Sequence, residues 1–154
     1  MAGARGLSLR GRALKLLSMR EQSRSELTRK LAPHSESAEQ LESLLDELQR
    51  AGYLSEQRFA ESLARRRAER YGRRFIEQEL DQHRVAGEVA APILRALAAD
   101  ERARAQALWE RRFGTAPADL AERARQHRFL AQRGFDGETI AWVLREAARP
   151  NRNG

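Results

Sequence analysis

Apolar residues recur every three or four positions along most of the chain, which is the spacing of one face of an α-helix. Leu41, Leu44, Leu45 and Leu48 give the clearest example. No stretch alternates Val, Ile or Thr with polar residues, as a half-buried strand would. The pattern therefore predicts an all-α protein.

Residues that typically begin and end helices divide this pattern into nine segments. Ser23-x-x-Glu26 is a capping box, in which the two side chains satisfy amide groups at the start of a helix. A longer helix is expected to begin after Ser55 and to run to about Tyr71. Pro117 is expected in the first turn of a later helix, where a missing amide hydrogen costs nothing.

Two glycines are expected to end helices in the left-handed conformation, which a residue without Cβ adopts easily. Gly52 is followed by Tyr53, and Gly134 is followed by Phe135. In such a turn the next large residue folds back onto the helix that has just ended. We therefore expect Tyr53 and Phe135 to pack at helix junctions.

The nine helices are expected to form three similar units. Leu31, Leu80 and Leu130 are 49 and 50 positions apart, and an aliphatic pair follows each of them at +13 and +14. This period predicts three tandem three-helix repeats that form an elongated, curved array. The expected division is a flexible N-terminal arm at 1–9, repeats at 10–54, 55–99 and 100–149, and a frayed tail at 150–154.

Composition narrows the functional classes. The chain has 154 residues, a net charge of +7 and no cysteine, so disulfides and thiol catalysis are excluded. No apolar run approaches the roughly 20 residues of a membrane span, and the first ten residues lack the apolar core of a signal peptide. A cytoplasmic protein with no membrane partner is expected.

The residues needed for catalysis or metal binding are not grouped. The three histidines are 49 and 44 positions apart, and no glycine-rich phosphate-binding loop is present. Carboxylates such as Asp46 and Glu47 are adjacent, so on a helix they point to different faces and cannot share a proton. We therefore expect no catalytic residue, no cofactor and no metal.

Basic residues carry the remaining functional signal. The clearest group lies in one predicted helix and its end, where guanidinium groups three and four residues apart share a side and can bind phosphates without reading sequence. A second group lies between Arg5 and Arg20, and a third lies between Arg123 and Arg133 near Phe129. For the first group, the alternative is a solvated face paired with Glu61, Glu69 and Glu77. None of the basic groups shows the interleaved aromatic residues of a platform that stacks single-stranded nucleic acid. The candidate phosphate-facing residues are Arg24, Arg65, Arg66, Arg67, Arg70, Arg73, Arg74, Arg123 and Arg128.

Four stretches occur in an order that is informative as a set. They are Arg24-Ser-Glu-Leu27 with Leu31; Leu48 with Gly52-Tyr53-Leu54 and Arg58-Phe59-Ala60; Tyr71-Gly72 with Ile76 and Glu79-Leu80; and Arg128-Phe129-Leu130 with Arg133-Gly134-Phe135 and Ile140. The set, over about residues 12–148, resembles the RecX family of recombinase regulators. The chain departs from the family pattern at Ser55-Glu56. It departs again at His83-Arg84-Val85, which stands where a turn of the Lys-Gly-Ile type is common in the family.

The resemblance implies three tandem three-helix repeats and binding to the RecA recombinase, chiefly to its filament on single-stranded DNA. It further implies that the protein restrains filament growth, ATP hydrolysis, strand exchange and cleavage of the SOS repressor by occupying the filament. Contact with the single-stranded DNA would be weak or indirect, and a monomer is expected. The candidate arginines would then face the filament.

The alternative is a direct, sequence-independent DNA-binding protein of the helix-turn-helix type. Such a protein needs Arg, Asn or Gln in the first turn of the recognition helix. Gln57 and Arg58 would serve in one unit, but Gly137, Glu138 and Thr139 would not serve in another. The resemblance and this asymmetry favour the recombinase regulator.

Overall fold

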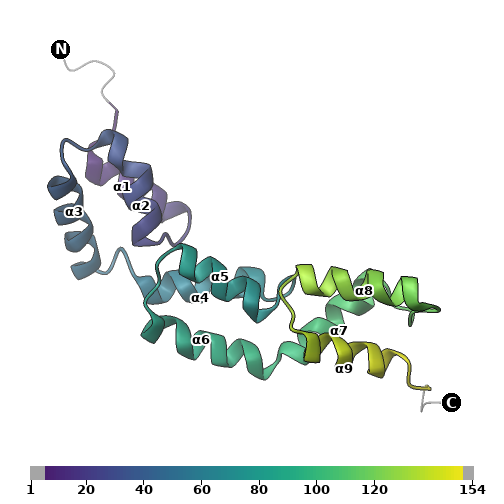
Figure 1. Cartoon of the computed structure of the whole chain (residues 1–154). Coiled ribbons are helices and arrows are strands. Elements are labelled where there is room, and N and C mark those ends of the chain that lie inside the picture. The colour runs from purple at the N-terminus through teal and green to yellow at the C-terminus, as the bar shows by residue number, and fades with distance from the viewer. Residues whose placement is uncertain (1–5, 151–154) are drawn as a thin grey trace.

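The computed structural model describes residues 6–150, which hold nine α-helices, one short 3-10 helix and no strand (Figure 1). The helices are α1 (Leu9–Met19), α2 (Arg24–Leu31), η1 (Ala32–His34), α3 (Ala38–Arg50), α4 (Glu56–Arg67), α5 (Arg73–Gln82), α6 (Gly87–Ala99), α7 (Glu101–Arg112), α8 (Leu120–Gln132) and α9 (Gly137–Ala147). The prediction of an all-α protein is confirmed. Residues 1–5 of the expected arm and 151–154 of the expected tail lie outside the described residues.

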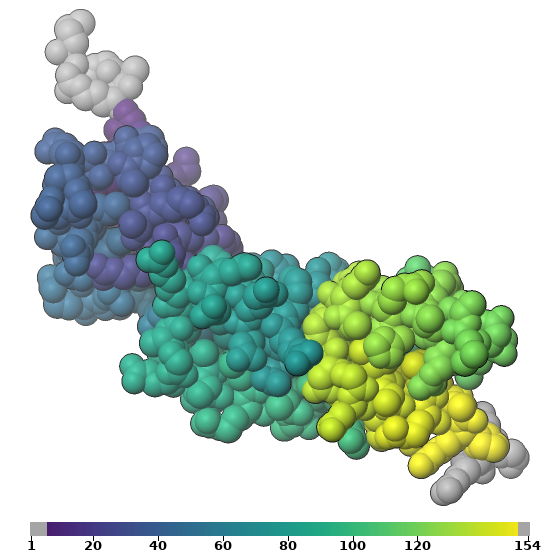
Figure 2. All heavy atoms as spheres, viewed as in Figure 1, coloured from purple at the N-terminus to yellow at the C-terminus, as the bar shows by residue number. Residues whose placement is uncertain are grey.

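Each successive group of three helices encloses its own hydrophobic core. We call the groups repeat 1 (α1–α3), repeat 2 (α4–α6) and repeat 3 (α7–α9). The three repeat leucines, Leu31, Leu80 and Leu130, are all buried, each in a different core. Figure 2 shows the repeats following one another in an elongated, bent body, and Figure 1 shows α3, α6 and α9 along its outer edge. The predicted tandem array is confirmed.

Local side-chain chemistry explains where several helices begin. The capping box at the start of α2 is complete, because the Ser23 hydroxyl accepts the Glu26 amide at 3.0 Å and the Glu26 carboxylate accepts the Ser23 amide at 2.9 Å. Two predicted bounds were wrong. Pro117 precedes α8, which begins after Asp119, whose carboxylate accepts the Glu122 amide at 2.8 Å.

The predicted extension of α4 to Tyr71 was also wrong, since the helix ends at Arg67. The Arg70 amide donates to the Arg67 carbonyl three residues back, at 3.0 Å, as in a tight turn. The Gly72 amide then donates to the Arg133 carbonyl at 2.7 Å and not to a carbonyl four residues back, so the helix does not continue. Arg70 therefore lies beyond the helix on which the predicted arginine stripe depended.

The two glycine turns behave as expected, but one of the residues that follow them does not. Gly52 and Gly134 have φ values of 83° and 90°, and Phe135 is buried. Tyr53 is instead 52% exposed, and Leu54 packs against repeat 1 in its place. The prediction that Tyr53 packs at the junction was therefore wrong. The other two aromatic motif residues contact the cores as expected, Phe59 fully buried and Phe129 partly buried.

Candidate functional site

Repeats 2 and 3 meet through their backbones. The Gly72 amide donates to the Arg133 carbonyl at 2.7 Å, and the Arg74 amide donates to the Gly134 carbonyl at 3.3 Å. A Cβ on Gly72 would lie 2.4 Å from the Gly134 oxygen, and a Cβ on Gly134 would lie 2.6 Å from Phe75. Only glycine permits this approach, so the junction joins the two repeats as one packed unit.

Arginines from α7 satisfy the carbonyl groups at the end of α4. Arg104 donates to the carbonyls of Ala68 and Tyr71, both at 2.8 Å, and Arg111 donates to that of Glu69 at 2.9 Å. The last carbonyls of a helix and of its closing turn have no partners within the helix, and they carry its partial negative charge. The contacts therefore stabilise the junction and bring cations of repeat 3 next to those of repeat 2.

Guanidinium groups alternate with aromatic rings across the same junction. The Arg133 guanidinium lies 5.2 Å from the ring centre of Tyr71 and 5.0 Å from that of Phe129. Arg112 lies 5.5 Å from Phe129 and 5.2 Å from Phe113. These separations are in the range of cation–π contacts. We define the arginine–aromatic row as Arg67, Tyr71, Arg133, Phe129, Arg112, Phe113 and Arg125.

The expectation was that no basic group shows the interleaved aromatic residues of a platform for single-stranded nucleic acid, whereas the structure brings arginines and aromatic rings together in alternation at this junction. The row joins segments that are distant in sequence, so most of it has no local signal. One part was nevertheless visible in the chain, because Arg125 and Phe129 of α8 and Arg133 at its C-cap are spaced by four residues. Residues at that spacing share a helix face.

Three of the nine candidate arginines are held by carboxylates. Arg24 pairs with Asp46 at 2.8 Å, and Arg67 makes two hydrogen bonds to Glu79, at 2.9 and 3.0 Å. Arg73 pairs with Glu77 at 2.9 Å within α5. These three arginines therefore stabilise the fold through ion pairs. Of the partners expected from the sequence, Glu61, Glu69 and Glu77, it is Glu77 that pairs with one of them.

The other six candidates have no carboxylate partner within residues 6–150. They are Arg65, Arg66, Arg70, Arg74, Arg123 and Arg128. They do not form one stripe: Arg123 and Arg128 are five positions apart on α8, so their directions differ by about 140°. Burial, with the charges of Arg20 and Arg67, lowers the pKa of the Arg66 guanidinium. The positive charge near the junctions is therefore only partly neutralised by the chain itself.

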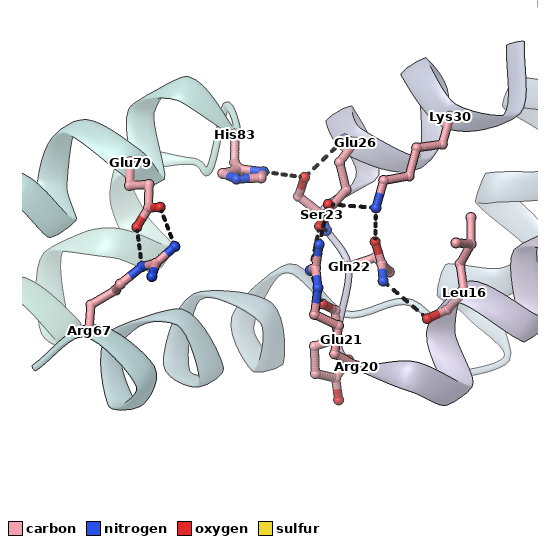
Figure 3. A network of polar contacts seen from close by, with 10 residues as sticks. All are labelled: Leu16, Arg20, Glu21, Gln22, Ser23, Glu26, Lys30, Arg67, Glu79 and His83. Atoms are coloured by element: carbon pink, nitrogen blue, oxygen red, sulfur yellow. Dashed lines mark hydrogen bonds and ion pairs between the residues drawn. The ribbon is translucent and has the colours of Figure 1, made fainter.

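Repeats 1 and 2 meet through polar side chains (Figure 3). The Ser23 hydroxyl lies 2.7 Å from Nδ1 of His83, and Arg58 donates to Glu21 at 2.9 Å. Burial at this junction lowers the pKa of the His83 imidazole. The hydrophobic cores of repeats 1 and 2 stay separate. Among the described residues no backbone hydrogen bond joins repeats 1 and 2, whereas two join repeats 2 and 3.

A buried carboxylate anchors the repeat 1 side of that junction. Glu26 is 2% exposed and accepts hydrogen bonds from Arg20 at 2.8 and 3.0 Å and from Lys30 at 3.2 Å. Burial by itself would raise the pKa of Glu26, but the hydrogen bonds from Arg20, the Ser23 amide and Lys30 outweigh it and lower the pKa to about 2. Glu26 is therefore ionised and compensated at neutral pH.

The described part of the chain shows no group of three or more His, Asp or Glu side chains placed to hold a metal ion. Within residues 6–150 no helix combines the length and the apolar character needed to cross a bilayer.

Comparison with known proteins gives the family. Family models match residues 55–92, as the second three-helix domain of RecX, and residues 100–144, as the third. Curated proteins named "Regulatory protein RecX" are 50% identical in Ralstonia nicotianae, over 92% of this chain and 89% of that protein, and 50% identical in Leptothrix cholodnii, over 92% and 90%.

Solved structures support the fold. The crystal structure of RecX from Lactobacillus salivarius superposes with a TM-score of 0.75, 17% identity and coverage of 90% of this chain and 94% of that one. A second structure, described as regulatory protein RecX, gives a TM-score of 0.74 at 20% identity, with 88% and 70% covered. By its close relatives and its family models, the chain belongs to the RecX family of regulatory proteins.

Proposed function

We propose that this protein binds the RecA recombinase, chiefly its filament on single-stranded DNA in the cytoplasm. Bound there as a monomer, it restrains ATP hydrolysis, strand exchange and cleavage of the SOS repressor, and so regulates DNA repair and recombination. It acts by occupancy, without a catalytic residue or a cofactor of its own. Its contacts with the DNA are weak or indirect.

One observation carries the proposal: exposed guanidinium groups that pair with no carboxylate of residues 6–150 lie on a packed two-repeat unit. Arg65 and Arg70 belong to repeat 2, and Arg128 belongs to repeat 3. Because the junction holds these repeats together, their charges keep fixed separations and can meet several anionic groups of an extended partner at once. Several weak contacts on one body add through effective concentration.

The helix-turn-helix alternative has less support. In repeat 2 the two residues suited to reading bases are engaged within the protein. Arg58 donates to Glu21 and, at 2.6 Å, to the Gly52 carbonyl, while the Gln57 amide donates to Glu61 at 3.2 Å. Direct base reading would have to break these contacts.

The test measures binding to immobilised single-stranded DNA with and without RecA and a non-hydrolysable ATP analogue, by biolayer interferometry. The wild-type protein is expected to bind the RecA-coated DNA much more tightly than bare DNA. Replacing Arg65, Arg70 and Arg128 by glutamine should weaken that binding, and the loss should be larger at low salt than at high salt.

A matched control removes the same charge from the outer edge of the bend. Arg50 on α3, Arg95 on α6 and Arg145 on α9 are also exposed, and their triple glutamine variant should bind nearly as the wild type does. An equal loss of affinity for RecA-coated DNA in both variants would show that net charge, and not the position of these arginines, determines binding. Equal binding to bare and RecA-coated DNA would favour the direct DNA-binding protein instead.

A further inference from the structure

A groove of about 490 Å³ lies between repeats 1 and 2, apart from the arginine–aromatic row. Arg24 and Arg29 of α2 line one wall, and His83, Arg84 and Glu56 line the other. Ser23 faces His83 at the junction of the two walls (Figure 3). The volume is in the range of pockets that hold a small ligand or a few side chains of a partner.

Arg84 adopts a backbone conformation that glycine adopts in the other two repeats. Among residues 6–150 it is the one non-glycine residue with a positive φ, at 57°, whereas Gly52 and Gly134 have 83° and 90°. The turns correspond: the Val85 amide donates to the Leu80 carbonyl at 3.1 Å, as the Phe135 amide does to that of Leu130 at 3.2 Å. Glycine would make this turn without strain, so the arginine side chain is kept at a cost in stability.

The charges in the groove are unevenly compensated. Arg24 is held by Asp46, and the Glu56 carboxylate accepts the Ala86 amide at 2.9 Å. Arg29 and Arg84 are exposed and have no carboxylate partner among the described residues. Two guanidinium groups therefore remain available to an anionic ligand.

We propose that this groove binds a short acidic peptide segment of a protein partner, with Arg29 and Arg84 as its carboxylate-binding residues. Guanidinium groups pair with carboxylates through two parallel hydrogen bonds, which suits side chains of Asp or Glu. Glu56 lines the groove with its carboxylate bonded to the Ala86 amide, and Asp46 holds Arg24, so two guanidinium groups and not a long basic track face a ligand. Two isolated positive charges fit the two carboxylates of a short acidic segment, whereas a long polyanion binds to a row of cations along its length.

This inference goes beyond the proposed function, because the groove is formed by the chain alone and needs neither nucleic acid nor a recombinase filament. The probe is a fluorescein-labelled hexapeptide of alternating Asp and Glu with capped ends, and the matched neutral peptide has Asn and Gln. Fluorescence anisotropy measures affinity, and ¹H–¹⁵N spectra of the full chain locate the site. We expect the acidic peptide to bind, with amide shifts at Ser25, Arg29 and Arg84.

Arg29→Gln and Arg84→Gly should each weaken peptide binding by about fivefold, the loss expected for one partly exposed charge-assisted contact. Arg95→Gln, which removes the same charge from α6, should leave it unchanged. Arg84→Gly should also raise the melting temperature, because glycine relieves the positive φ. A lower affinity with a higher melting temperature therefore separates loss of the contact from loss of the fold.

Three results would overturn the proposal. The acidic peptide fails to bind, or it binds Arg29→Gln and Arg84→Gly as tightly as it binds Arg95→Gln. Alternatively, an oligomer of six thymidylates shifts the same amides at lower concentration than the peptide does, which would assign the groove to nucleic acid.

Discussion

Replacing Gly72 by alanine would separate repeats 2 and 3 at the contact between their backbones. The new Cβ would lie 2.4 Å from the Gly134 oxygen, whereas ordinary contacts begin at 3.4 Å, so the two loops must move apart by about 1 Å. That movement lengthens the 2.7 Å bond from Gly72 to Arg133 and the 3.3 Å bond from Arg74 to Gly134. Gly72 has an ordinary φ of −81°, so alanine adds no other strain.

The expected loss of stability follows from these two effects. Two hydrogen bonds contribute about 1 kcal/mol each, and the displaced packing adds a cost of similar size, so the free energy of unfolding should fall by about 2–4 kcal/mol. Loss of this backbone contact should also allow repeats 2 and 3 to unfold separately. Both tryptophans, Trp109 and Trp142, lie in repeat 3, so their fluorescence follows repeat 3 while circular dichroism follows all helices.

The assay is urea unfolding followed by both signals. In the wild type the part of the dichroism change that comes from repeats 2 and 3 should fall at the urea concentration of the tryptophan transition, whereas in Gly72→Ala part of it should move away from that transition. Gly87→Ala is the matched control, since a Cβ on Gly87 meets nothing within 4 Å, and its stability should be unchanged or slightly higher. A Gly72→Ala protein as stable as this control would refute the close junction.

Three further predictions concern the core, the buried carboxylate and catalysis. Leu80→Ala should lower the free energy of unfolding by about 2–5 kcal/mol, because Leu80 is fully buried in repeat 2. Urea unfolding measures this loss, and a variant that unfolds at the same urea concentration as the wild type would contradict the buried position of Leu80. The pKa of Glu26 is lowered to about 2 from 4.5, so its contribution to stability is present above pH 4.5 and is lost as the pH falls toward 2. Glu26→Gln, which keeps an acceptor for the Ser23 amide, should therefore lose part of this acid dependence in melting curves, and an unchanged curve would count against the ionised pair. The purified protein alone should not hydrolyse ATP in a phosphate-release assay, whereas turnover that survives repurification would reopen an enzymatic function.

Most of the fold could be predicted because its signals are local. The capping box at Ser23 and the glycine turns at Gly52 and Gly134 each depend on residues within one turn of a helix. The end of α4 at Arg67 could not be placed, since the residues up to Tyr71 are all compatible with a helix. Arginines of repeat 3 stabilise the earlier end by satisfying its carbonyls, and that contact is absent from the local sequence.

The candidate site was only partly predictable for the same reason. The basic character of the segment around Arg65 and Arg70 is evident from composition, but which arginines are neutralised depends on distant partners. Arg67, for example, is held by Glu79 on the following helix. The arginine–aromatic row joins Tyr71 to Phe129 through Arg133, and this contact exists only because repeats 2 and 3 pack together.

Electron cryomicroscopy of RecA filaments on single-stranded DNA, assembled with a non-hydrolysable ATP analogue and saturated with this protein, tests the central claim most directly. We expect extended density for the three repeats along the filament, contacting more than one RecA protomer, with the junction of repeats 2 and 3 turned toward the filament. Filaments indistinguishable from those without the protein, or density confined to stretches of DNA free of RecA, would contradict it.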